Sequence, residues 1–101
     1  MSVDLSLLKA ADFFPYRNKI MFIRFEEGSR LPAELIQVTE LENHNKMARQ
    51  PFSIQFKTEQ KDAYYKQAIY TIEHPDKGDM EIFLVPLGQG DGGMKYEAVF
   101  S

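Results

Sequence analysis

The stretch FSIQFK, residues 52–57, decides the fold, because apolar and polar side chains alternate along it without a break. Successive side chains of a β-strand point to opposite faces, so Phe52, Ile54 and Phe56 would line one buried face. A strand with one buried and one solvated face is typical of an antiparallel sheet. Residues 52–57 therefore predict a half-buried antiparallel strand.

Five further runs have the residue types of strands, at residues 18–26, 31–41, 65–73, 80–87 and 94–100. They are rich in β-branched and aromatic side chains and are separated by short turn-forming or polar segments. Strands joined by hairpin-length connections pair antiparallel. We therefore predict an all-β fold of about six antiparallel strands that curl into a small barrel or a sandwich, which also removes exposed sheet edges.

The hydrophobic pattern also predicts which side chains are buried. The run at residues 80–87 is almost continuously apolar, so we expect it to be buried on both faces. Across the six strands, the side chains expected to form most of the core are Phe22, Leu35, Phe52, Ile54, Phe56, Ile69, Ile72, Phe83, Val85, Ala98 and Phe100.

One helix is expected before the strands. Residues 4–14 place Leu5, Leu8 and Ala11 at helical spacing, and Pro15 is expected to end the helix. The pattern predicts one short amphipathic helix that covers an end of the sheet.

The composition bounds the domain count and the class of partner. The 101 residues have room for one domain, expected to comprise the helix and a β-meander over about residues 18–101. The net charge of −3 argues against a nucleic-acid partner. The absence of cysteine excludes disulfides and thiolate metal sites. Because no apolar run is long enough to cross a bilayer and no signal-peptide pattern is evident, we expect a cytoplasmic protein without a membrane partner.

No group of residues predicts a catalytic, metal or cofactor site. His44 and His74 are far apart in the sequence and lack partner ligands at metal spacing, so we predict no metal and no cofactor. The glycine-rich segment 88–93 lacks the Gly-Lys-Ser/Thr ending of a phosphate loop and favours a flexible hairpin tip. We expect that the protein is not an enzyme; an unrecognised active site would have to use His44, His74, Arg49 or Glu73.

Polar loops are the candidate interaction sites. Arg49 ends the polar loop before the strand at residues 52–57, where its guanidinium could clamp the loop to carbonyl or carboxylate oxygens. Docking is expected at the loops 43–50 and 88–93 or at an uncovered strand edge. The candidate interaction or loop-clamp residues are Arg49, His44, His74 and Gln89.

Several segments carry a family resemblance: RQPFSIQF at 49–56, QAIY at 67–70 followed by His74-Pro75 and Gly78, IFLVPLG at 82–88, and YEAVF at 96–100. In this order and spacing they resemble the DUF6916 family of small uncharacterised bacterial proteins. The resemblance is strong over about residues 49–100 and looser over 5–42. Ser101 departs from it, because members of the family often carry Asn there. The resemblance implies no established activity and no assigned catalytic residues.

The resemblance also implies a gene neighbourhood shared with tail-collar or fibre-like proteins of phage type, which favours an assembly, chaperone or adaptor role. We therefore expect a non-enzymatic protein-interaction or assembly module whose partner is another protein, with tail-collar or fibre-like proteins as candidates. The module is expected in the cytoplasm or incorporated into a larger particle. The alternative is a small-molecule-binding β-barrel, against which the many large inward side chains argue.

Overall fold

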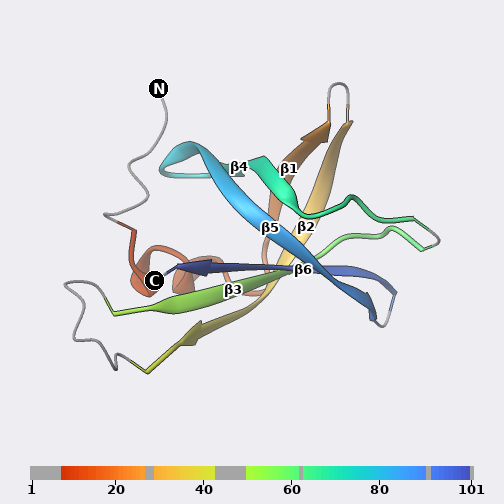
Figure 1. The fold of residues 1–101 in the computed structure, drawn as a ribbon. Helices are drawn as coiled ribbons and strands as arrows, with labels where there is room; N and C mark the ends of the chain where they lie inside the picture. Colours follow the sequence, from red (N-terminus) through yellow and green to blue (C-terminus); the bar gives the residue numbers. More distant parts are fainter. Residues whose placement is uncertain (1–7, 27–28, 43–49, 62, 91, 101) are drawn as a thin grey trace.

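The computed structural model describes residues 8–26, 29–42, 50–61, 63–90 and 92–100. Six antiparallel strands form a closed barrel in the order β1-β2-β3-β6-β5-β4, which confirms the predicted fold class (Figure 1). Two 3-10 turns precede the strands. In chain order the elements are η2 (Ala10–Asp12), η3 (Phe14–Tyr16), β1 (Ile20–Glu26), β2 (Ser29–Glu40), β3 (Phe52–Lys57), β4 (Ala68–His74), β5 (Gly78–Gly90) and β6 (Gly93–Phe100).

The short N-terminal helical segment is present, but its bounds and geometry differ from the expected amphipathic helix. Within the described residues it begins at Ala10 and consists of the two 3-10 turns. Pro15 lies in the first turn of η3 instead of ending the helix, because a residue at that position needs no backbone N–H. The predicted residues 4–7 lie outside the described part of the chain.

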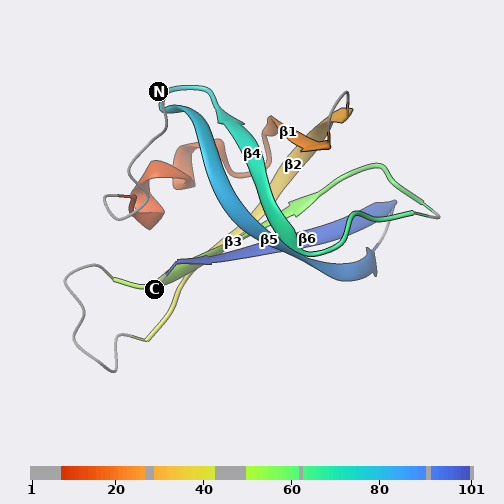
Figure 2. The same ribbon diagram turned by 45° about the horizontal axis from the view of Figure 1, so that its top comes forward.

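The helical turns lie at one end of the barrel, and the connection between β3 and β4 lies at the other, as both views show (Figures 1 and 2). Strand β5 pairs with two neighbours in turn. Its first part, from Gly78 to Leu84, pairs with β4, and its second part, from Val85 to Gly90, pairs with β6. Both ends of the barrel are filled by aromatic side chains, Phe13 at the helical end and Tyr65 at the other.

The barrel interior is filled with large side chains. The largest fully buried ones include Tyr96, Phe13, Phe52 and Phe56. Phe52 stacks on Phe100 with ring centroids 4.6 Å apart. The Tyr96 hydroxyl donates to Gln60 Oε1 at 2.7 Å, so the polar end of this buried side chain has a hydrogen-bond partner.

Seven of the side chains predicted to form the core are buried: Leu35, Phe52, Ile54, Phe56, Ile72, Ala98 and Phe100. Phe22 and Val85 are only half-buried. The prediction is wrong for Ile69 and Phe83, which are 66% and 50% exposed. It is also wrong that the run 80–87 is buried on both faces, because Met80, Ile82 and Leu84 point inward and the alternate residues point outward.

Candidate functional site

The barrel closes between β1 and β4, and these two strands pair over only part of their length. We call this junction the seam. Among the residues that the structure describes, these strands form three residue pairs, Phe22 with Glu73, Ile23 with Ile72 and Arg24 with Thr71. Beyond Arg24, a register shift in the β1–β2 pairing displaces the end of β1, and no further pair with β4 is formed among the described residues.

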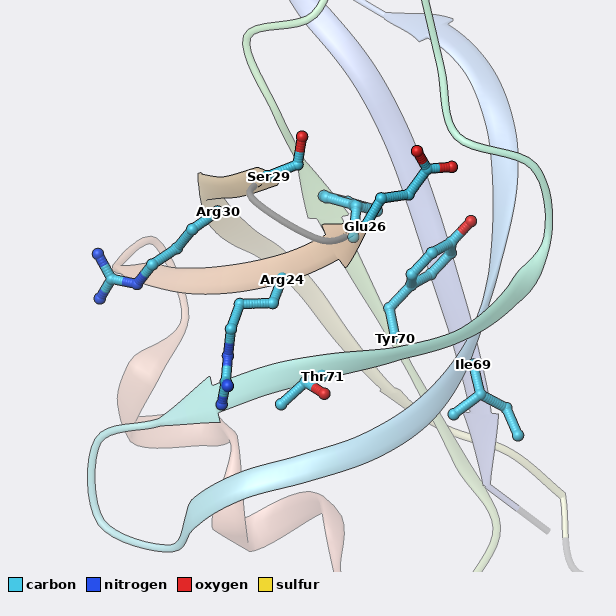
Figure 3. A pocket seen from close by; sticks show the side chains of 8 residues that line it. Arg24, Glu26, Ser29, Arg30, Ile69, Tyr70 and Thr71 are labelled. Atoms are coloured by element: carbon cyan, nitrogen blue, oxygen red, sulfur yellow. The ribbon is translucent and has the colours of Figure 1, made fainter.

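A surface pocket of about 450 Å³ occupies this gap, and we call it the seam pocket (Figure 3). It is lined by Arg24, Phe25, Glu26, Ser29, Arg30, Ile69, Tyr70 and Thr71.

The floor of the seam pocket is aromatic. Phe25 and Tyr70 are buried, with ring centroids 5.0 Å apart, and the Tyr65 ring stacks on that of Phe25 with centroids 4.6 Å apart. The Tyr65 hydroxyl donates to Ser29 Oγ at 2.8 Å, and the Tyr70 hydroxyl donates to the Lys66 carbonyl at 2.6 Å. Burial raises the pKa of Tyr70, and the nearby Glu26 carboxylate raises it further. The floor is therefore a fixed surface whose hydroxyl donors are already engaged.

An apolar pair borders the seam pocket on the outer face of the barrel. Ile69 of β4 lies directly opposite Phe83 of β5 in the strand register. Their side chains are 66% and 50% exposed, and Ile69 also lines the pocket. Side chains opposite each other on neighbouring strands have Cβ atoms about 5 Å apart. The two side chains therefore form one exposed apolar surface beside the gap.

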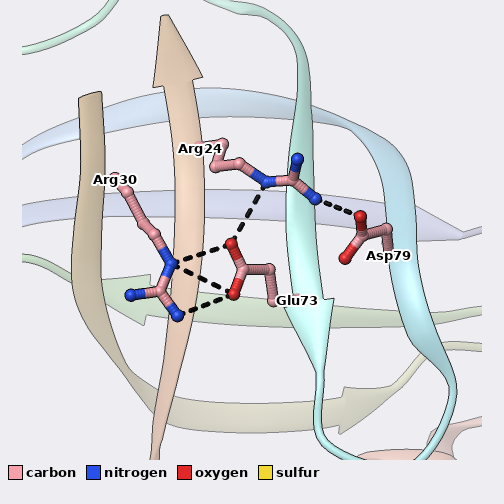
Figure 4. Close-up of polar contacts among 4 residues, drawn as sticks. All are labelled: Arg24, Arg30, Glu73 and Asp79. Atoms are coloured by element: carbon pink, nitrogen blue, oxygen red, sulfur yellow. Dashed lines mark hydrogen bonds and ion pairs between the residues drawn. The ribbon is translucent and has the colours of Figure 1, made fainter. Parts of the chain in front are cut away.

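The closed end of the seam is held by charge. Arg24 and Arg30 are opposite each other on β1 and β2, and like charges in that arrangement repel. Glu73 of β4 lies between them: its carboxylate accepts bonds from Arg30 at 2.8 and 2.9 Å and lies 3.1 Å from Arg24 Nε (Figure 4). Arg24 also pairs with Asp79 of β5, and the Arg30 guanidinium lies 3.8 Å above the Phe22 ring.

Replacing Glu73 with glutamine is expected to lower the free energy of unfolding by about 1 kcal/mol at neutral pH, a modest value because both arginines are about half exposed. The hydrogen bond from Arg30 lowers the pKa of Glu73 from 4.5. Its contribution is therefore complete above about pH 5 and is lost as the pH falls through the lowered folded pKa. Urea unfolding of wild type and variant across this pH range should show the difference closing towards acid.

The matched control is Glu81→Gln. Glu81 is an exposed residue of β5, and the described residues form no ion pair with it. Its replacement should change stability by no more than about 0.5 kcal/mol at any pH. A difference in the free energy of unfolding between wild type and Glu73→Gln that stays constant from pH 7 to acid would contradict the assigned role of the carboxylate.

His74, one of the sequence-predicted residues, is a buried connector at the helical end. Its Nε2 lies 2.9 Å from the Asp12 carbonyl oxygen, and its Nδ1 accepts from the backbone N–H groups of Asp76 and Lys77, both at 3.1 Å. Because Nδ1 accepts, Nε2 carries the proton and donates to Asp12. The ring therefore ties η2 to the β4–β5 turn, and it does not line the seam pocket.

The remaining predicted residues are not brought together. Gln89 is exposed, and its Nε2 lies 3.5 Å from the Gln60 carbonyl oxygen at the opposite end from His74. Residues 88–90 belong to the β5–β6 ladder, so less of the segment 88–93 is a loop than expected. His44 and Arg49 lie outside the described residues, as does the loop 43–49.

The seam pocket was not predicted from the sequence. The alternation around Ile69 did carry a signal, because Gln67, Thr71 and Glu73 share its face and are polar. Applied strictly, this period-two pattern places Ile69 outside.

The described residues contain no cluster of three or more potential metal ligands, and none of their helices is long and apolar enough to cross a membrane.

The family model described as "Domain of unknown function (DUF6916)" matches residues 8–100. No curated protein and no solved structure matches the chain.

Proposed function

The chain belongs to the DUF6916 family, and we propose that it is a non-enzymatic protein-interaction module whose docking surface is the seam pocket with the adjoining pair Ile69 and Phe83. The observation that carries this proposal is the exposure of that pair beside a pocket. Contiguous exposed apolar side chains on a compact domain mark interaction sites, because burying them against a partner is favourable by about 25 cal/mol per Å².

The chemistry of the pocket supports docking in preference to catalysis. Arg24 and Arg30 are neutralised by Glu73 and Asp79, and the Ser29 hydroxyl is engaged by Tyr65. A general base or nucleophile needs a group that can reach a substrate proton or carbon. The polar groups named here are instead committed to holding the strands and the aromatic floor in place.

The partner in this proposal is another protein, with tail-collar or fibre-like proteins as the first candidates and the cytoplasm or a larger particle as the site of assembly. A small-molecule-binding barrel is less well supported, because Tyr96, Phe52 and Phe56 fill the interior and the 450 Å³ pocket lies on the surface.

Native mass spectrometry of the protein, purified gently from its own host, tests the proposal. We expect a stoichiometric protein adduct, which would also identify the partner. A small, fixed mass increment that is lost on denaturation would favour the ligand-binding alternative. A bare monomer that stays monomeric after titration with the tail-collar and fibre-like proteins of the same host would contradict the proposal.

A further inference from the structure

We propose that the seam pocket binds an extended peptide segment of the partner, which adds as a strand to the free edge of β4 at residues 68–70. The inference rests on the proposed function and specifies how the partner binds. On one edge, β4 is paired with β5 along its full length, from Ala68 with Leu84 to His74 with Gly78. On its other edge, the pairing with β1 begins only at Thr71. Residues 68–70 therefore have strand geometry and one edge that no described strand covers.

The backbone of that edge determines what fits it. A strand carries N–H and C=O groups along both edges, and an uncovered edge is a template for another extended chain. β1 does not fill the place, because the register shift between Arg24 and Glu26 displaces its end. Three residues of β4 span about 10 Å, so a segment of about four to six residues would cover the free edge.

The side chains of the edge select the apolar part of the segment. Ile69 points outward and lies opposite Phe83, so an outward side chain of an added strand would continue the same row next to Ile69. Tyr70 and Phe25 form the floor on the inner side. An aliphatic residue such as valine or isoleucine at the outward position would cover Ile69.

The charges around the seam determine which charged residue the docking segment should carry. Arg24 and Arg30 are balanced by Glu73 and Asp79, so these four groups leave no net charge. Glu26, an exposed residue that lines the pocket, forms no ion pair with any residue in the described part of the chain and leaves the seam with a net charge of −1. A basic residue two positions from the aliphatic one, on the same outward face of the segment, complements this carboxylate.

The same charges disfavour a second copy of the chain as the occupant. Pairing of two β4 edges would bring together the Glu26 carboxylates of two molecules that each carry a net charge of −3. The geometry and charge point instead to a different protein whose docking segment carries aliphatic and basic residues in turn on its outward face.

Solution NMR with synthetic peptides tests this inference. The probe is an eight-residue peptide with threonine at every second position and with valine and lysine alternating at the positions between, so that valine and lysine share one face. It is compared with a valine–glutamate peptide of the same pattern and with the valine–lysine peptide carrying proline at its centre. We expect saturable shifts of the backbone amides of residues 68–71 and 25–26 with the first peptide. Both of the others should bind at least tenfold more weakly, because glutamate meets Glu26 and proline cannot complete a strand ladder.

A substitution of Glu26 tests the preference for a basic peptide separately. Glu26→Gln should bring the affinities of the lysine and glutamate peptides to within about threefold of each other. The control is Glu40→Gln, because Glu40 is an exposed residue at the far end of β2. This substitution should leave the tenfold difference in affinity between the lysine and glutamate peptides unchanged.

Three results would overturn the strand-addition inference: shifts that map away from the seam, equal binding of the proline peptide, or self-association in place of peptide binding. None of these would remove the proposed function. A protein adduct that forms in native mass spectra while the valine–lysine peptide does not bind would retain the interaction module and reject strand addition as its mode.

Discussion

Phe13→Ala is expected to lower the free energy of unfolding by about 3–5 kcal/mol, the range for removing a fully buried aromatic side chain. The Phe13 side chain is completely buried at the helical end of the barrel. Its ring centroid lies 5.8 Å from that of Phe52, 6.1 Å from that of Phe100 and 5.5 Å from that of His74. One side chain therefore joins the N-terminal turns to β3, β6 and β4, and its loss leaves a cavity that three strands border.

Urea unfolding followed by circular dichroism measures this effect, and the neighbouring Phe14 supplies the control. Phe14 is 42% exposed, so Phe14→Ala should cost no more than about 1 kcal/mol. Since a domain of this size has about 5–15 kcal/mol of stability in total, the Phe13 variant should be close to unfolded under mild denaturant. Equal effects of the two substitutions would show that the helical turns contribute little to the core.

Gly93→Ala is the second substitution with a large expected effect. An added Cβ at this position would lie 1.6 Å from the Thr58 carbonyl oxygen and 2.8 Å from its carbon. The backbone of Thr58 cannot move away freely, because its N–H donates to the Met94 carbonyl at 2.9 Å. Accommodating the methyl group requires separation of the β3–β4 connection from the start of β6, so we expect a loss of at least about 3 kcal/mol.

Gly92→Ala distinguishes this steric effect from backbone strain. Gly92 has a φ of +82° but nothing within 4 Å of its ideal Cβ, so alanine should cost only about 1–2 kcal/mol there. Thermal unfolding should place the midpoints in the order wild type, Gly92→Ala, Gly93→Ala. A Gly93 variant at least as stable as the Gly92 variant would contradict the close approach of the two backbones.

The strands could be predicted from the sequence because their signals are local. The alternation in residues 52–57 and the turn-forming residues at 74–78 are each read from a short stretch of chain, and all six strands are found at the expected places. The barrel closure, with β1 beside β4, brings together residues about fifty positions apart. A local pattern predicts that such a sheet will close, but does not specify which strands pair.

The docking surface depends on the part of the fold that local patterns leave open. In the run 80–87, apolar residues occupy both parities, so the pattern does not identify which of Phe83 and Leu84 faces the core. The answer comes from the pairing with β4, whose inward residues Tyr70 and Ile72 lie opposite Ile82 and Met80. The open seam depends on the register shift in β1 and β2, which is likewise a property of the assembled barrel.

The most direct test of the docking surface is the affinity of the purified partner for wild type, Ile69→Lys and Val99→Lys. Val99 is the matched control, because it is 60% exposed but lies on β6 and does not line the seam pocket. Both substitutions should leave folding within about 0.5 kcal/mol of wild type. We expect Ile69→Lys to weaken binding at least tenfold and Val99→Lys to change it less than twofold. Equal affinities for wild type and Ile69→Lys, or a loss confined to Val99→Lys, would contradict the seam as the docking surface.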